Sequence, residues 1–160
     1  MNHQIIGVIS DTHGLFDPKI PSLFRDVHCI LHAGDIGDFE VLHQLENLAS
    51  VIAVSGNVDE GNLPLGIDLE KNVLLFGVRV FMTHILGNPH CLNSSQMERI
   101  RVIQPQAVIF GHSHKPFLEK VGEILYFNPG SAGPKRFSLP RTLGLLEIEG
   151  GNFQGKIIEL

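Results

Sequence analysis

Seven side chains suited to holding metal ions each follow a short apolar run in this sequence. They are Asp11, His13, Asp35, Asn57, His84, His112 and His114. All of them are oxygen or imidazole donors, and none is a thiolate. Such a set suits divalent cations that activate water better than it suits a structural zinc site. The residue types therefore favour hydrolytic metal chemistry.

The apolar runs before these residues predict the elements that position them. The runs are rich in Val and Ile and cover residues 5–9, 29–31, 51–54, 80–82 and 108–110. Short runs of this kind, separated by helix-like stretches, are typical of buried parallel strands. Because such sheets bind ligands beyond the carboxyl ends of their strands, we expect the seven side chains to converge on one edge.

The spacing within this set is also informative. Asp11 and His13 are two residues apart, as are His112 and His114. In an extended chain this spacing sends both side chains the same way, so one short segment can supply two ligands to neighbouring metal sites. Glycine directly precedes three of the seven candidates, at positions 34, 56 and 111. The missing Cβ lets the backbone turn tightly and approach the metals.

Capping residues predict three helices between the strands. They are Asp17 followed by Pro18, then Asp38, then Ser95 with Glu98 at capping-box spacing. Each helix separates two of the apolar runs, as crossovers between parallel strands require.

The later part of the chain changes to pairs of adjacent strands. Short turns containing Gly separate three such pairs, over residues 73–82, 117–127 and 143–159. The stretch between Asn57 and Val73 lacks periodicity and is expected to be a surface loop. The predicted architecture is an α/β fold of two packed mixed β-sheets flanked by helices, in a single domain of residues 1–160.

The bulk composition describes a folded protein with little affinity for long polyanions. A hydrophobic share of 43% with 18% charged residues excludes wholesale disorder. The net charge of −5 argues against extended nucleic-acid binding, which needs many phosphate contacts. The apolar runs fall far below the roughly 18 residues that span a bilayer, and no basic secretory segment precedes the first strand, so a cytoplasmic location is expected. The two cysteines are too few for a disulfide framework.

In this order, the motifs resemble those of the calcineurin-like metallophosphoesterases. They read Asp-x-His, Gly-Asp, Gly-Asn-x-Asp, a lone His after a strand, and Gly-His-x-His. The chain length and the segments 10–14, 56–59, 111–114 and 128–131 resemble more closely the small YfcE-type bacterial and archaeal phosphodiesterases. Each motif alone is weak, but five in matching order between about Ile5 and Ser131 are specific.

The resemblance implies a dinuclear hydrolase. One metal would be held by Asp11, His13, Asp35 and His114, and the other by Asp35, Asn57, His84 and His112. Asp35 would bridge the two, and Asp35, Asn57 and His84 are the expected catalytic residues. A pair of ions about 3.5 to 4 Å apart can share a hydroxide that attacks phosphorus. Mn²⁺ is the expected metal because the family is commonly active with it, and the donor types also admit Fe, Zn²⁺, Co²⁺ or Ni²⁺.

One position departs from the wider family. Many members have a His after the Gly-Asn pair, thought to protonate the leaving group, whereas this chain has Val58. Such proton donation is typically worth about 10²- to 10⁴-fold in rate. The predicted activity is therefore hydrolysis of small phosphodiesters, rather than of monoesters, by a metal-bridging hydroxide.

Two other functions stay open on the sequence. A protein-binding scaffold would resemble the retromer subunit of eukaryotes, which has lost part of the His set that this chain retains. A nuclease would keep the chemistry, although the small size and acidic balance count against it. The sequence does not fix the natural substrate, and an exposed hydrophobic edge could pair subunits into a homo-oligomer.

Five further residues have expected supporting roles. His32 is expected to act structurally beside the site rather than as a ligand, Asp59 to orient the Asn57 loop, and Ser131 to support the metals. His90 and Arg136 could meet the substrate, although a surface role is favoured for each.

Overall fold

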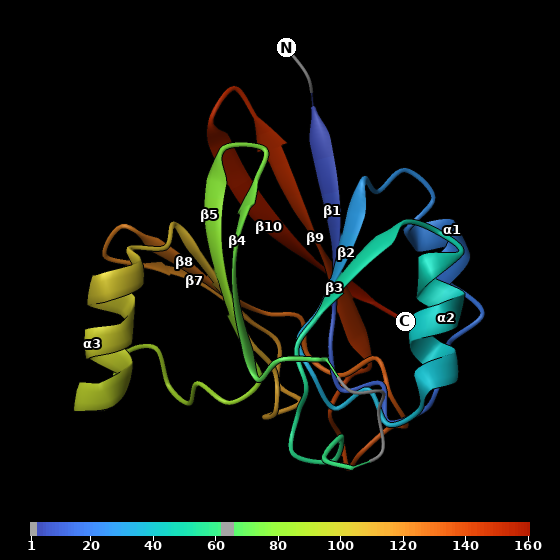
Figure 1. Ribbon diagram of the computed structural model, residues 1–160. Coiled ribbons are helices and arrows are strands. Elements are labelled where there is room, and N and C mark those ends of the chain that lie inside the picture. The colour runs from blue at the N-terminus through green and yellow to red at the C-terminus, as the bar shows by residue number, and fades with distance from the viewer. Residues whose placement is uncertain (1–2, 62–65) are drawn as a thin grey trace.

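The apolar runs form the inner strands of two packed β-sheets (Figure 1). The computed structural model describes residues 3–61 and 66–160. One sheet, sheet A, contains β1 (Gln4–Ile9), β2 (Cys29–His32), β3 (Ser50–Ala53), β9 (Thr142–Glu149) and β10 (Asn152–Glu159). The other, sheet B, contains β4 (Glu70–Leu75), β5 (Val78–Thr83), β6 (Ala107–Ile109), β7 (Phe117–Val121) and β8 (Ile124–Asn128). The helices are α1 (Ile20–Leu23), α2 (Phe39–Glu46) and α3 (Ser94–Ile103).

Each sheet has a parallel centre extended by antiparallel strands. Sheet A runs β10-β9-β1-β2-β3, with β1, β2 and β3 parallel, and sheet B runs β4-β5-β6-β8-β7, with β5, β6 and β8 parallel. The three predicted hairpins are confirmed as β4–β5, β7–β8 and β9–β10. The prediction of a single sheet edge is wrong in one respect, because the five runs before the ligands divide between the two sheets.

Buried side chains fill three layers around the sheets. Ile6 and Leu31 of sheet A pack with Met82 and Phe127 of sheet B in the core between the sheets. The next residue along a strand points to the opposite face, so Ile30 packs with the outer cluster under α1 and α2. A third cluster lies between sheet B and α3. Helices thus cover the outer face of both sheets, which keeps the parallel strands buried on both sides.

One of the three predicted helix caps is confirmed. Asp38 caps α2 through its carboxylate. The predicted cap of α1 is wrong, because Lys19 stands at that position and Asp17 instead accepts the Lys19 backbone N–H. The cap of α3 is Asn93, which forms a capping box with Gln96 two residues before the predicted one. Asn caps a helix as well as Ser does, so the sequence contains two possible capping boxes two residues apart, and the structure uses the first.

The expected loop between Asn57 and Val73 is partly confirmed. Strand β4 begins at Glu70, earlier than predicted, and residues 62–65 of this stretch lie outside the described part of the chain. Over residues 3–61 and 66–160, no helix has the length and apolar character needed to cross a membrane.

The placement of Phe127 predicts a large stability effect. Its ring is fully buried between the sheets and fills the space left by Gly144 and Gly155. We expect Phe127→Ala to lower the free energy of unfolding by about 3 to 5 kcal/mol, because it removes buried surface and leaves a cavity. Urea denaturation followed by circular dichroism measures this. The control is Phe137→Ala, since Phe137 is 93% exposed and its loss should change stability by no more than about 0.5 kcal/mol. Equal effects of the two substitutions would contradict the assigned core.

Candidate metal centre

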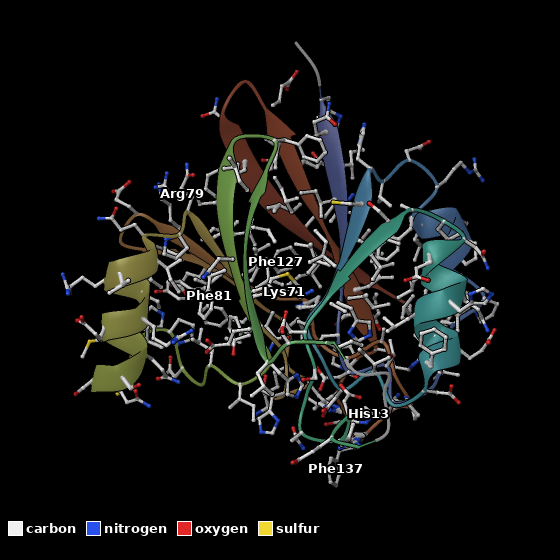
Figure 2. The ribbon with its side chains drawn as sticks, viewed as in Figure 1. His13, Lys71, Arg79, Phe81, Phe127 and Phe137 are labelled. Carbon is white, nitrogen blue, oxygen red and sulfur yellow. The ribbon has the colours of Figure 1, made fainter. Side chains whose placement is uncertain are left out.

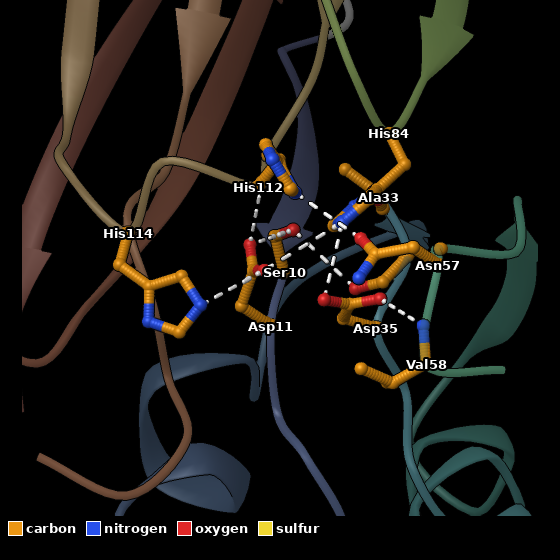
Figure 3. Close-up of polar contacts among 12 residues, drawn as sticks. Ser10, Asp11, Ala33, Asp35, Asn57, Val58, His84, His112 and His114 are labelled. Atoms are coloured by element: carbon orange, nitrogen blue, oxygen red, sulfur yellow. Dashed lines mark hydrogen bonds and ion pairs between the residues drawn. The ribbon is translucent and has the colours of Figure 1, made fainter. Parts of the chain in front are cut away.

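The seven predicted ligands lie in the loops that follow the parallel strands, and Figure 3 shows all of them except His13 close together. The structure brings six of them into two groups, Asp11 with His13 and His114, and Asp35 with His84 and His112. Within each group the candidate ligand atoms lie within 4.8 Å of one another. The seventh, Asn57, places its Oδ1 atom 3.1 Å from Nδ1 of His112.

The Asp35 carboxylate lies between the two groups. Its Oδ2 atom is 3.2 Å from Nε2 of His84 and 3.8 Å from Nε2 of His13. These two imidazoles belong to different groups, so Asp35 faces both. This is the position that a bridging ligand needs.

Each of the two carboxylates has one oxygen held by the protein and one oxygen facing imidazoles. Oδ2 of Asp11 accepts hydrogen bonds from the Ser10 hydroxyl and from the His112 backbone N–H, while Oδ1 lies 3.3 Å from Nε2 of His114. Oδ1 of Asp35 accepts the Val58 backbone N–H, and Oδ2 faces the histidines. The hydrogen bonds thus orient both groups and leave one oxygen of each directed into the centre.

The tautomers of two histidines follow from their partners. Nδ1 of His84 lies 2.8 Å from the Ala33 carbonyl oxygen, which can only accept, so the proton is on Nδ1. Nδ1 of His112 donates in the same way to the Asn57 side-chain oxygen. In the neutral form, both rings therefore carry the lone pair on Nε2, and second partners that fix a ligand histidine in this way are typical of metal sites.

Three buried polar atoms have no hydrogen-bond partner in the part of the chain that the structure describes. They are Oδ1 of Asp11, Nε2 of His84 and Nδ1 of His114. A buried polar atom left unsatisfied costs about 1 to 3 kcal/mol, so such atoms are rare without a reason. In addition, Nε2 of His13 faces Nε2 of His114 at 3.2 Å. Lone pairs gathered in this way fit a site for divalent cations.

The carboxylates are in the form that binds cations. Burial raises the pKa of Asp35, but the neighbouring His84 and the hydrogen bond from the Val58 backbone N–H outweigh burial and lower the pKa to about 2. Burial likewise raises the pKa of Asp11, and interactions with His114 and Ser10 outweigh it, so that the pKa is below its ordinary value. Both groups are therefore anionic at neutral pH.

The ligand backbone is left-handed rather than extended. Asp11, His13, Asp35, His112 and His114 have φ angles between 46° and 72°. Residues other than glycine rarely adopt this conformation, and each instance stores about 1 to 3 kcal/mol of strain. The prediction that Asp11 and His13, and likewise His112 and His114, lie in extended chain is therefore wrong. His112 and His114 do reach different groups, whereas Asp11 and His13 share one.

Two of the predicted glycines are required by close approach. A Cβ at Gly111 would overlap the Ser10 hydroxyl and lie 2.7 Å from Oδ2 of Asp11. A Cβ at Gly56 would overlap Oδ1 of Asp35. Any other residue at either position would displace a carboxylate of the centre.

Asp59 and Ser131 support the ligand loops as predicted. Asp59 accepts backbone N–H groups from Ile36, Gly37 and Gly56, so it ties the loop after β2 to the loop after β3. The Ser131 hydroxyl donates to the Asp11 carbonyl oxygen at 3.0 Å.

His32 has a structural role, which confirms the sequence-based interpretation. Its Nδ1 atom accepts the Gly34 backbone N–H, so its Nε2 atom carries the proton and donates to the Thr12 hydroxyl, which in turn donates to the Ile36 carbonyl. Both ring nitrogens are satisfied, and no lone pair is left for a metal. Burial lowers the pKa of His32 to about 4, so the ring is neutral.

Arg141, which the sequence analysis missed, stabilises the segment that packs against the Asp11 loop. Its guanidinium donates to the carbonyls of Ala132 and Gly133 and to the carboxylate of Asp17. No local pattern identifies this contact, because Asp17 and Arg141 are 124 residues apart. By contrast, His90 does not join the centre, and pairs with Glu119 at 3.1 Å.

The sequence matches one family model over most of its length. Residues 5–151 match the model of the calcineurin-like phosphoesterase superfamily domain. A probable metallophosphoesterase of Methanocaldococcus jannaschii is 37% identical over 167 residues, which cover 98% of this chain and 82% of that protein. The phosphodiesterase YfcE of Escherichia coli K12 is 31% identical over 115 residues, which cover 68% of this chain and 59% of that protein.

Solved structures share the fold. An archaeal phosphodiesterase superposes with a TM-score of 0.70 at 27% identity, covering 97% of this chain and 100% of that one. Vacuolar protein sorting 29 of Cryptosporidium parvum superposes with a TM-score of 0.76 at 16% identity, covering 99% of this chain and 98% of that one. At this low identity, the second likeness shows the fold alone.

The buried neutral His32 predicts a pH dependence of stability. Its pKa is about 4 in the folded protein against an ordinary value of 6.5, so the unfolded chain binds the extra proton first. The contribution of His32 is complete above about pH 6.5 and is lost as the pH falls toward about 4, on the order of 3 kcal/mol in total. We expect His32→Gln to have a shallower loss of unfolding free energy over this range, measured by urea denaturation with a chelator present. Parallel pH profiles of the two proteins would contradict a buried neutral His32.

Proposed function

The chain belongs to the calcineurin-like phosphoesterase superfamily, and on this basis we propose that it hydrolyses small phosphodiesters at a dinuclear metal centre. The observation that carries the proposal is the gathering of six Asp and His side chains into two groups, in which Oδ1 of Asp11 and Nε2 of His84 are buried and have no hydrogen-bond partner among the described residues. The names of two relatives support the substrate class, since both the Escherichia coli protein and the archaeal structure are phosphodiesterases. We further propose that residues 1–160 form one such domain, in agreement with the extent of the family match.

The proposed ligand sets are those that the resemblance implied. Asp11, His13 and His114 would hold one cation, and His84, His112 and Asn57 the other, with Asp35 shared. Two divalent ions so held, with Mn²⁺ as our proposal, would supply a water of lowered pKa as nucleophile and would stabilise the attacking and leaving oxygens.

The charge of the centre favours an anionic substrate. Asp11 and Asp35 contribute two negative charges, and two dications contribute four positive ones, which leaves an excess of +2. The centre can therefore attract a phosphoryl group although the whole chain is acidic.

The chain's own residues orient the reacting parts rather than donate a proton to the leaving group. Val58 fixes Asp35 through its backbone N–H and presents an apolar side chain. The His84 proton is engaged by the Ala33 carbonyl, on the side away from Asp35. A centre of this kind suits esters whose leaving oxygen is stabilised without a side-chain acid, which is why we propose diesters.

The scaffold and nuclease alternatives are less favoured. The likeness to vacuolar protein sorting 29 extends to the fold only, whereas all seven donors are retained here and six of them form two groups. A nuclease would need a surface that follows a polyanion, and the net charge of −5 opposes this.

Removing a proposed ligand should abolish turnover. We expect Asp35→Asn and His112→Ala to lower Mn²⁺-stimulated hydrolysis of bis(4-nitrophenyl) phosphate by at least about 100-fold, since metal ions contribute several kcal/mol to the transition state. Release of 4-nitrophenol at constant metal concentration measures this. His43→Ala, on the exposed face of α2, is the matched control and should keep wild-type rates. Activity retained by both ligand variants would rule out this centre.

A histidine introduced at position 58 should extend the activity to monoesters. Because Val58 lies directly after Asn57, we expect Val58→His to raise hydrolysis of β-glycerophosphate, whose alcohol leaves poorly, by up to about 10²-fold. Phosphate release measures the rate. Val58→Gln is the control that adds a polar but non-titrating side chain. The same rate in both variants would show that a missing acid does not limit monoester hydrolysis.

A further inference from the structure

Phe137 is an exposed aromatic residue at the same end of the molecule as the metal centre (Figure 2). Of the large apolar side chains in the described residues it is the most exposed, at 93%, and its backbone is left-handed with φ of 52°. It projects from the same end of the molecule as His13 (Figure 2). A left-handed phenylalanine stores about 1 to 3 kcal/mol of backbone strain, and a ring exposed at 93% recovers none of this by packing in the core, which suggests a use in binding.

The loop that carries Phe137 begins at Gly133, which packs against the ligand loop of Asp11. Gly133 packs so closely on the ligand loop that a Cβ would overlap the Asp11 carbonyl oxygen. Arg141 holds the Gly133 carbonyl at 2.6 Å, and the Leu139 backbone N–H closes a turn around Phe137 by donating to the Arg136 carbonyl. These contacts fix the start of the loop and the turn around Phe137, so the backbone that carries the ring is held in place.

Arg136, the neighbour of Phe137, adds positive charge on this side of the centre. Burial lowers the pKa of His13, and the charge of Arg136 contributes to the lowering. Arg136 itself is exposed, so its guanidinium is accessible to a phosphate bound at the centre. An aromatic face next to a cation is a typical arrangement for binding a base together with its phosphate.

The groove beside Asn57 and His84 carries more negative than positive charge among its described lining residues. It has a volume of about 1190 Å³, and its described lining includes the exposed carboxylates of Glu60 and Asp68 together with Glu70. Among its described lining residues the one cation is Arg99, and this pairs with Glu70. A second phosphate in the groove would meet like charge, so an uncharged arm fits better.

We propose that Phe137 is a stacking platform for a flat aromatic group, such as a nucleobase, on the ester bound at the metal centre. The inference rests on the proposed function, because it takes the phosphoryl group to lie among the metal ligands. The substrate class narrows to small diesters with one aromatic arm over Phe137 and one uncharged arm in the groove.

Binding of two sugar phosphates, one with a base and one without it, tests the platform. Isothermal titration calorimetry of the Mn²⁺-loaded protein would compare thymidine 5′-monophosphate with 2-deoxyribose 5-phosphate. We expect the thymidine compound to bind about 5- to 100-fold more tightly, the range that stacking of one base supplies. Phe137→Ala should abolish this preference and leave the affinity for the sugar phosphate unchanged.

Phe76→Ala is the matched control. Phe76 is also exposed and left-handed, but it lies in the β4–β5 turn at the opposite end of the molecule, so the preference for the base should persist (Figure 1). Equal affinities of the wild type for the two probes, or a preference that survives in Phe137→Ala, would overturn the platform. Because binding is measured without turnover, base-dependent binding with no hydrolysis of bis(4-nitrophenyl) phosphate would reject the proposed function and keep the platform.

Discussion

The buried and unpartnered Oδ1 of Asp11 and Nε2 of His84 lie 3.9 Å apart with no hydrogen bond between them, and Nε2 of His114 lies 3.3 Å from the same Asp11 oxygen. Left alone, such atoms destabilise the fold, because each has lost water and gained no partner. The other polar atoms of these side chains, Oδ2 of Asp11 and Nδ1 of His84, are held by hydrogen bonds, so the orientation of each group is specific. The Ser10 hydroxyl holds one oxygen of Asp11, and the Ala33 carbonyl fixes the proton of His84 away from the centre. A cation is the partner that satisfies what remains.

The rest of the fold makes this cost tolerable. Five ligands sit in left-handed backbone, and two glycines admit carboxylates that any Cβ would displace. Such strain persists only where the surroundings determine the conformation fully. The two parallel strand groups supply that rigidity, because their ends are fixed by the core between the sheets and by helices on both outer faces. Asp59, His32 and Arg141 then extend the order from the strand ends into the loops.

Much of this arrangement could be predicted from the sequence, because the signals are local. An apolar run followed by Gly-Asp or Gly-His identifies both the strand and the donor at its end, and hairpin turns identify the antiparallel pairs. The division of the runs between two sheets could not be predicted, since it depends on which strands pair across long sequence distances. The left-handed conformation of Asp11 and the contact of Arg141 with Asp17 were missed for the same reason. Both are imposed by tertiary packing, and short sequence motifs contain no information about that packing.

The central claim is that the scattered donors form two cation sites that share Asp35. Its most direct test is the number of Mn²⁺ ions bound per chain, measured by equilibrium dialysis and elemental analysis. The account predicts two ions for the wild type and a loss of at least one in His84→Ala, whose Nε2 atom is among the buried unpartnered donors. A wild-type chain that binds no metal, or a His84→Ala variant that still binds two ions with unchanged affinity, would contradict it.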